Sequence, residues 1–195
     1  MKLSYLKILI LIFLPILILG CNVDDDDGTG DTLPPVTTQG ASTFGCKING
    51  QVFLPKMESC FLCGRTEKMR LSYFQSGDTY QLGINAYNDI NGDVSMHLDL
   101  YLDEPLAVGV YELSESYIAS IDRTWPNAAI NINRKINNEI INSSFGTNSE
   151  MTGTLEILEY NITERFIAGV FEFQAINQQG KIVEISEGRF DMRIH

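Results

Sequence analysis

Alternation of apolar and polar side chains is the feature of this chain that most constrains its fold. From Val94 to Leu102 every second residue is apolar, and the residues between are Ser, His, Asp and Tyr. The run 80–87 shows the same alternation, and Asn91-Gly92 lies between the two runs. A period of two is typical of a β-strand that buries one face. Asn-Gly accepts the positive φ angles of a tight turn, so the sequence predicts a β-hairpin here.

The same pattern recurs along the rest of the C-terminal region. Further strands are expected at residues 44–48, 51–54, 69–74, 152–160, 166–176 and 182–194. Turn residues separate them, as at Asn49-Gly50, and Glu187-Gly188 interrupts the last run as a β-bulge does. Consecutive strands with short turns form an antiparallel meander. We therefore expect an all-β fold, a β-sandwich or an up-and-down barrel, with at most one short helix within 113–121.

The N-terminus has the pattern of an export signal. Lys2 and Lys7 precede an uncharged run that ends at Leu19. A membrane-spanning helix needs about 20 apolar residues, whereas the apolar part of a signal peptide needs about 7 to 15. Gly20-Cys21 follows directly and resembles a lipobox, in which the cysteine is acylated and becomes the new N-terminus. Residues 1–20 are thus expected to be a lipoprotein signal peptide, with an ordinary cleaved signal or an uncleaved anchor as alternatives.

Residues 21–40 have the composition of a tether. This segment contains aspartates at 24–27, three glycines at 28–40 and Pro34-Pro35, and it has few apolar residues to offset the entropy of ordering. We expect it to be disordered and to precede one β domain at 41–195. Acidic residues just after a lipidated cysteine resemble the export signals of Bacteroidota lipoproteins. This resemblance implies anchoring in the outer membrane facing the cell exterior, and the periplasmic face is the alternative.

The charge of the chain argues against nucleic acid as a partner. The formal net charge is -11, and no run of Lys or Arg stands out. A protein that neutralises phosphates needs a basic patch. The expected partners are therefore the membrane, through the N-terminal lipid, and a glycan or protein at the cell surface.

Three thiols besides the lipidated cysteine offer possible chemistry. They are Cys46, Cys60 and Cys63, and the last two form a CxxC motif. An oxidising envelope favours a disulfide, most simply between Cys46 and one of the other two. A redox pair is an alternative. So is a zinc site, which needs a fourth ligand such as His97 or His195. We expect neither a metal nor a cofactor.

The single tryptophan marks a possible binding surface. Trp125 lies near Tyr117 and Arg123 in a loop-like stretch. Aromatic and arginine side chains of this kind bind sugar or protein when they are exposed. Burial of Trp125 between the sheets is the alternative.

The two ends of the domain resemble a family of small flavobacterial (Bacteroidota) lipoproteins of unknown function. The motifs of this resemblance are residues 43–50 with Phe53 and Pro55, 153–157, 167–177, Gly180, Val183 and 188–191. Residues 56–150 resemble the family poorly. The resemblance implies an all-β lipoprotein, and it implies neither a substrate nor catalytic residues.

These features predict a lipid-anchored envelope lipoprotein with a non-catalytic binding domain. Strands with short turns leave little loop material, and loops are where catalytic residues usually lie. Two alternatives stand beside this prediction. The first is an envelope enzyme or redox protein that uses Cys60 and Cys63, and the second is a calycin-like carrier of a small apolar ligand.

Overall fold

The computed structural model describes residues 31–57, 67–90, 93–115, 127–136 and 139–195. The chain divides into two compact units, Met1–Thr32 and Leu33–His195. The β domain therefore begins at Leu33, eight residues before the boundary predicted at 41. Residues 33–42 run along the domain ahead of its first strand, and we call them the N-terminal arm. The predicted signal peptide and lipidation site, including Gly20 and Cys21, lie outside the described residues.

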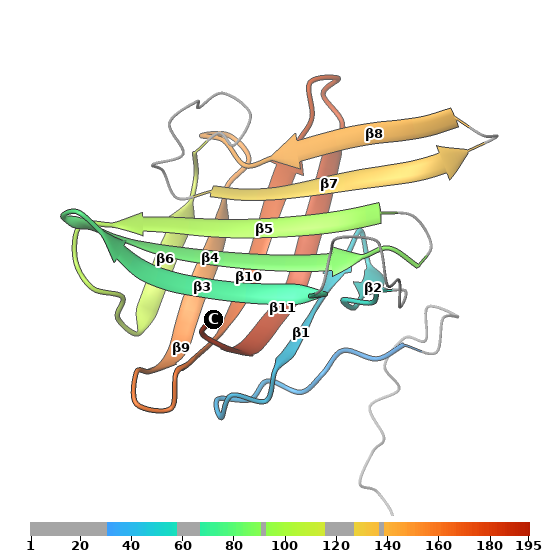
Figure 1. Cartoon of the computed structure of the whole chain (residues 1–195). Helices are drawn as coiled ribbons and strands as arrows, with labels where there is room; N and C mark the ends of the chain where they lie inside the picture. Colours follow the sequence, from blue (N-terminus) through green and yellow to red (C-terminus); the bar gives the residue numbers. More distant parts are fainter. Residues whose placement is uncertain (1–30, 58–66, 91–92, 116–126, 137–138) are drawn as a thin grey trace, which may run out of the picture. The chain divides into compact units, whose positions relative to one another are not determined.

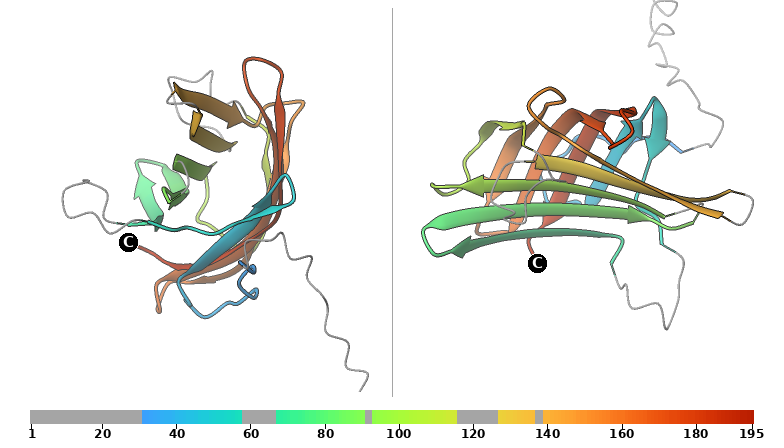
Figure 2. Two further views of the ribbon diagram at one scale, coloured as in Figure 1. Left: turned by 90° about the vertical axis from the view of Figure 1, so that its right-hand side faces the viewer. Right: turned by 90° about the horizontal axis from the view of Figure 1, so that it is seen from above.

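The second unit is all-β, as the alternation predicts, and no described residue is helical. Its strands are β1 (Thr43–Ile48), β2 (Gln51–Phe53), β3 (Met69–Ser76), β4 (Thr79–Asn88), β5 (Asp93–Leu102), β6 (Gly109–Leu113), β7 (Asn127–Ile136), β8 (Glu139–Gly146), β9 (Gly153–Asn161), β10 (Phe166–Ile176) and β11 (Ile182–Arg193). All the pairings between these strands are antiparallel. The strands form one continuous sheet that curls into a half-barrel (Figure 2).

The curled sheet has two layers whose strands cross (Figure 1). One layer runs in the order β3-β4-β5-β7-β8, and the other holds β2-β1-β11-β10 with β9 and β6 beyond β10. The layers join through a single pair of residues, Gly146 in β8 and Ile176 in β10. At the opposite end, the His195 amide donates a hydrogen bond to the Leu71 carbonyl (3.0 Å), which brings β3 close to the end of β11.

Besides the contact of β8 with β10, the pairing departs from a simple meander at three further places. The sequential hairpins β3-β4-β5 and β9-β10-β11 form as predicted. However, β1 pairs with β11, β5 pairs with β7, and β6 pairs with β9. These pairings join segments that are distant in the sequence, and local turn signals carry no information about them. The segment 113–121, where a short helix was allowed, begins as the last residue of β6, and 116–121 lies outside the described residues.

The predicted Asn49-Gly50 turn and the predicted bulge are present, whereas the predicted Asn91-Gly92 turn lies outside the described residues. Asn49 and Gly50 both have positive φ (49° and 82°), as a tight hairpin turn with an Asn-Gly pair requires. At the predicted bulge, Gly45 of β1 pairs with Arg189 of β11, but Lys47 pairs with Ser186. β11 therefore has one extra residue there, and Glu187 takes a φ of 51°.

The core lies between the two layers. Every second residue of the central strands points inward, as with Leu82 and Ile84 in β4 and Met96 and Leu98 in β5. The inward side chains of both layers form one hydrophobic cluster.

Candidate functional site

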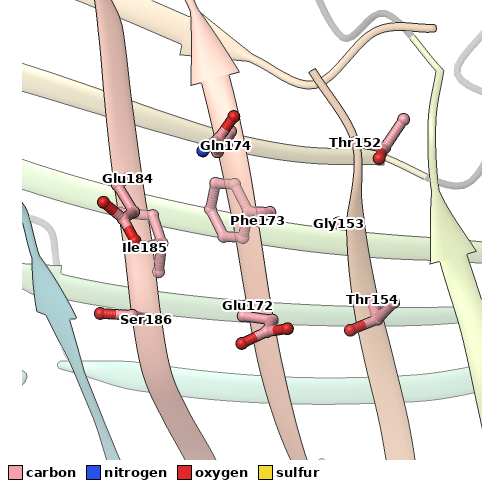
Figure 3. A pocket seen from close by; sticks show the side chains of 9 residues that line it. All are labelled: Thr152, Gly153, Thr154, Glu172, Phe173, Gln174, Glu184, Ile185 and Ser186. Atoms are coloured by element: carbon pink, nitrogen blue, oxygen red, sulfur yellow. The ribbon is translucent and has the colours of Figure 1, made fainter. Parts of the chain in front are cut away.

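The outward face of β9, β10 and β11 contains an open depression of about 310 Å³ (Figure 3). It is lined by Thr152, Gly153, Thr154, Glu172, Phe173, Gln174, Glu184, Ile185 and Ser186. The polar side chains among them carry hydroxyl, carboxylate and amide groups. Figure 3 shows that they come from three neighbouring strands, so a rigid sheet fixes their spacing. Such groups hold a ligand through hydrogen bonds and charge.

The alternation in β10 determines which side chains reach this face. Phe171 and Phe173 are each only 3% exposed, whereas Glu172 and Gln174, which alternate with them along the strand, are exposed. The strand register then places Thr154 of β9 opposite Glu172 and Glu184 of β11 opposite Gln174. The depression thus follows directly from strand period and register.

A second depression of about 340 Å³ adjoins the first one and shares Thr154 and Glu172 with it. Its other lining residues are Val36, Val110, Glu156, Val170, Phe171, Glu187, Gly188 and Arg189. The valines come from the N-terminal arm, β6 and β10, and Val110 is 66% exposed. We call the two depressions together the outer groove. The first depression is its polar half, and the second depression is a half with valines at its centre.

The charges around the outer groove are unevenly paired. Lys47 forms an ion pair with Glu187 (Nζ to Oε1, 2.7 Å), and Arg189 contacts the other oxygen of Glu187 at 3.4 Å. The hydrogen bond from Lys47, together with the charges of Lys47 and Arg189, outweighs partial burial and lowers the pKa of Glu187. Both cations are therefore engaged by one carboxylate. The remaining glutamates of the groove, Glu156, Glu172 and Glu184, make no ion pair with any residue that the structure describes.

The N-terminal arm is held against the sheet by Asp191. The Asp191 carboxylate accepts hydrogen bonds from the Thr37 hydroxyl (2.7 Å) and from the backbone amides of Gln39 (2.9 Å) and Gly40 (2.7 Å). Arg189 also donates to the Pro34 carbonyl at 3.4 Å. These contacts fix Val36 at the wall of the outer groove. The domain therefore includes residues 33–40, which the sequence assigned to a disordered tether.

Asp191 is buried, with 1% of its surface exposed. Burial alone would raise the pKa of its carboxyl. The hydrogen bonds from Gln39, Thr37, Ala41 and Gly40 favour the charged form more strongly, so the pKa lies below its usual value. The charge is thus stabilised by donors on the arm.

The predicted disulfide of Cys46 is not found. Cys46 lies on β1 inside the hydrophobic cluster, where it is fully buried as a free thiol. Burial raises the pKa of this thiol strongly, and the nearby charge of Arg189 only partly opposes the effect. A buried thiol with a raised pKa is chemically inert. Cys60 and Cys63 lie outside the described residues, so the CxxC motif stays a sequence prediction.

The predicted aromatic platform also lies outside the described residues, since Tyr117, Arg123 and Trp125 fall within 116–126. The structure shows only where this segment is attached. The Thr147 hydroxyl donates to the Glu115 carbonyl (3.0 Å) at its start, and Asn127 at its end pairs with Asp99 of β5.

His97 lies on the outward face of the other layer. Its Nδ1 forms a hydrogen bond with Asn85 Oδ1, and its ring lies edge-on to Tyr87 at 5.9 Å between centroids. His97 is thus part of a half-buried polar surface formed by β4 and β5. Over the described ranges, no group of three or more His, Cys, Asp or Glu side chains is placed to hold a metal ion.

Comparisons with protein-family models, with curated proteins and with solved structures found no match to this chain. In the part that the structure describes, no helix is both long and apolar enough to cross a membrane.

Sequence reasoning missed every residue of the outer groove. The alternation Phe-Glu-Phe-Gln at 171–174 marks Glu172 and Gln174 as outward, but it does not show which strands lie beside them. Their neighbours depend on pairings with β9 and β11 and on the docking of the N-terminal arm. No signal in the sequence revealed that Val36 and Val110 share a surface.

Proposed function

We propose that this protein is a lipid-anchored lipoprotein of the bacterial envelope whose β domain is a non-catalytic binding module. The observation that carries the binding role is the outer groove, where unpaired carboxylates, hydroxyls and exposed valines gather on a rigid sheet. The anchoring role is supported by Gly20-Cys21 behind a short apolar run.

The arrangement of the N-terminal part is consistent with this role. If Cys21 carries the lipid, only residues 22–32 separate the anchor from the domain, because the arm from Leu33 onward is held to the sheet. A chain of this length spans at most about 40 Å when fully extended. The domain then works close to the membrane surface, and its partner is a glycan or a protein of the cell surface.

Metabolic labelling with an alkyne fatty acid tests the anchoring. We expect label on the wild-type protein in the membrane fraction and none on Cys21→Ala. Protease added to intact cells then tests the orientation. Degradation of the β domain in intact cells supports display on the exterior, whereas protection until the outer membrane is opened places it on the periplasmic face. Absence of label on the wild-type protein would refute the lipoprotein proposal.

A further inference from the structure

We infer that the outer groove binds an extended peptide segment in which lysine or arginine lies two residues to either side of an aliphatic side chain. The inference rests on the proposed binding function and specifies the chemistry of the partner.

The aliphatic part of the inference comes from the valines of the groove. Val36 and Val110 are 50% and 66% exposed, and both line the same depression as Val170. Single exposed apolar residues are ordinary on protein surfaces, but a group in a hollow marks an interaction site. An aliphatic side chain that enters this hollow would contact the three valines and leave water.

The cationic part follows from charge complementarity. Glu156 and Glu172 border the valines, and Glu184 extends the same charge into the polar half of the groove. Lys47 and Arg189 are already paired with Glu187. A partner that carries positive charge therefore finds, on both sides of an apolar centre, carboxylates that pair with no residue in the described ranges, which favours association and selects against acidic partners.

An extended backbone suits the shape of the groove. Apart from Val36 of the N-terminal arm and Thr152 just before β9, the lining residues lie on four neighbouring strands, β6, β9, β10 and β11, so the groove runs across the sheet. Side chains of an extended chain point alternately to opposite sides. One residue can then enter the valine pocket while a cationic residue farther along reaches Glu184. The hydroxyls of Thr152, Thr154 and Ser186 can meet the peptide backbone.

The test uses the full-length lipidated protein in nanodiscs of zwitterionic lipid. The probe is a fluorescein-labelled, end-blocked peptide, Gly-Lys-Ser-Val-Ser-Lys-Gly, whose valine and lysines share one face of an extended chain, and its control has glutamate in place of lysine. Fluorescence anisotropy should show saturable binding of the lysine peptide only, weakened as NaCl is raised from about 0.05 to 0.3 M.

Matched variants locate the binding. Glu156→Gln with Glu172→Gln should weaken binding about tenfold, since it removes two exposed ion pairs. Glu150→Gln with Glu164→Gln changes the net charge equally at exposed sites outside the groove, and it should change binding less than about twofold. Val110→Thr should weaken binding, whereas Val108→Thr, at a valine that is also exposed but does not line the groove, should not.

Three results would overturn the inference. The first is no saturable binding of the lysine peptide below about 1 mM, and the second is an equal loss of affinity in the two charge variants. The third is that maltohexaose or chitohexaose binds in a way that depends on Glu172, while the peptide does not bind. The last result would make the groove a sugar site. None of these results affects whether Cys21 takes up the fatty-acid label. Failure of the peptide inference can therefore be distinguished from failure of the lipoprotein proposal.

Discussion

At the scale of single residues, Asp191 is the side chain on which the N-terminal arm depends most. Its buried carboxylate accepts three hydrogen bonds of 2.7–2.9 Å from residues 37–40. Asp191→Asn keeps the shape of the side chain but places its NH2 group against the hydroxyl and backbone N–H donors of the arm. We therefore expect this substitution to lower the free energy of unfolding by about 2–4 kcal/mol. Urea denaturation measures the loss, with the exposed Asp103→Asn as control. Equal stability of the two variants would show that the arm is not held by this carboxylate.

The same carboxylate predicts how stability depends on pH. The pKa of Asp191 in the folded protein lies below its value of about 3.9 in the unfolded chain. Its contribution is therefore fully present above about pH 4 and is lost as the pH falls below that value toward the folded pKa. Urea denaturation of wild type and Asp191→Asn from pH 7 to 3 should show a constant difference that narrows below about pH 4. A difference that does not narrow would contradict the hydrogen-bonded charge.

Cys46 gives a third prediction at this scale. Because its thiol is buried and its pKa is raised, it should not react with a thiol reagent in the folded protein at pH 8. In the variant Cys21→Ser with Cys60→Ser and Cys63→Ser, which keeps Cys46 as its one cysteine, titration should find no accessible thiol until urea unfolds the domain. Rapid reaction under native conditions would place Cys46 outside the core.

At the scale of elements, three residue pairs across β9–β10 and β10–β11 place a glycine opposite a phenylalanine. The pairs are Gly153 with Phe173, Gly169 with Phe190 and Gly188 with Phe171. A Cβ on Gly169 would lie 2.3 Å from the Glu156 carbonyl oxygen and 2.8 Å from the Phe190 ring. The close contacts explain why glycine occupies these positions.

Gly169→Ala tests this packing. We expect a loss of about 2–3 kcal/mol in the free energy of unfolding, since backbone must shift to admit the methyl group. Gly83→Ala is the control, because its Cβ meets only the Ser72 hydroxyl at 3.1 Å and the Asp99 carboxylate at 3.3 Å, both of which can rotate away. Thermal denaturation should separate the two variants clearly. A Gly169→Ala variant as stable as Gly83→Ala would contradict the packing of β9 to β11.

Some strands could be located from the sequence and others could not, because their local signals differ in strength. β4 and β5 alternate cleanly and are flanked by turn residues, and the prediction located both. β7 and β8 were not predicted, although Ile130 and Ile132 alternate with Asn131 and Asn133 and Asn137-Asn138 resembles a turn sequence. The many asparagines of this hairpin lower its strand propensity and hide the pattern.

The whole molecule combines a predictable fold class with a binding surface that was not predictable. Strand period establishes inward and outward faces, because it is a local property. The outer groove depends on β10 lying between β9 and β11, on β6 lying beside β9 and on the arm lying beside β1. These are long-range contacts, so the residues of the groove emerge only from the three-dimensional arrangement.

The intact mass of the protein purified from the membrane fraction tests the central claim most directly. The account predicts a mature chain that begins at Cys21 and carries a diacylglyceryl or triacyl modification on that residue. Treatment that cleaves the ester-linked chains should reduce the mass by whole fatty acids. A mature chain that begins at another residue, or one in which Cys21 bears no lipid, would contradict the account.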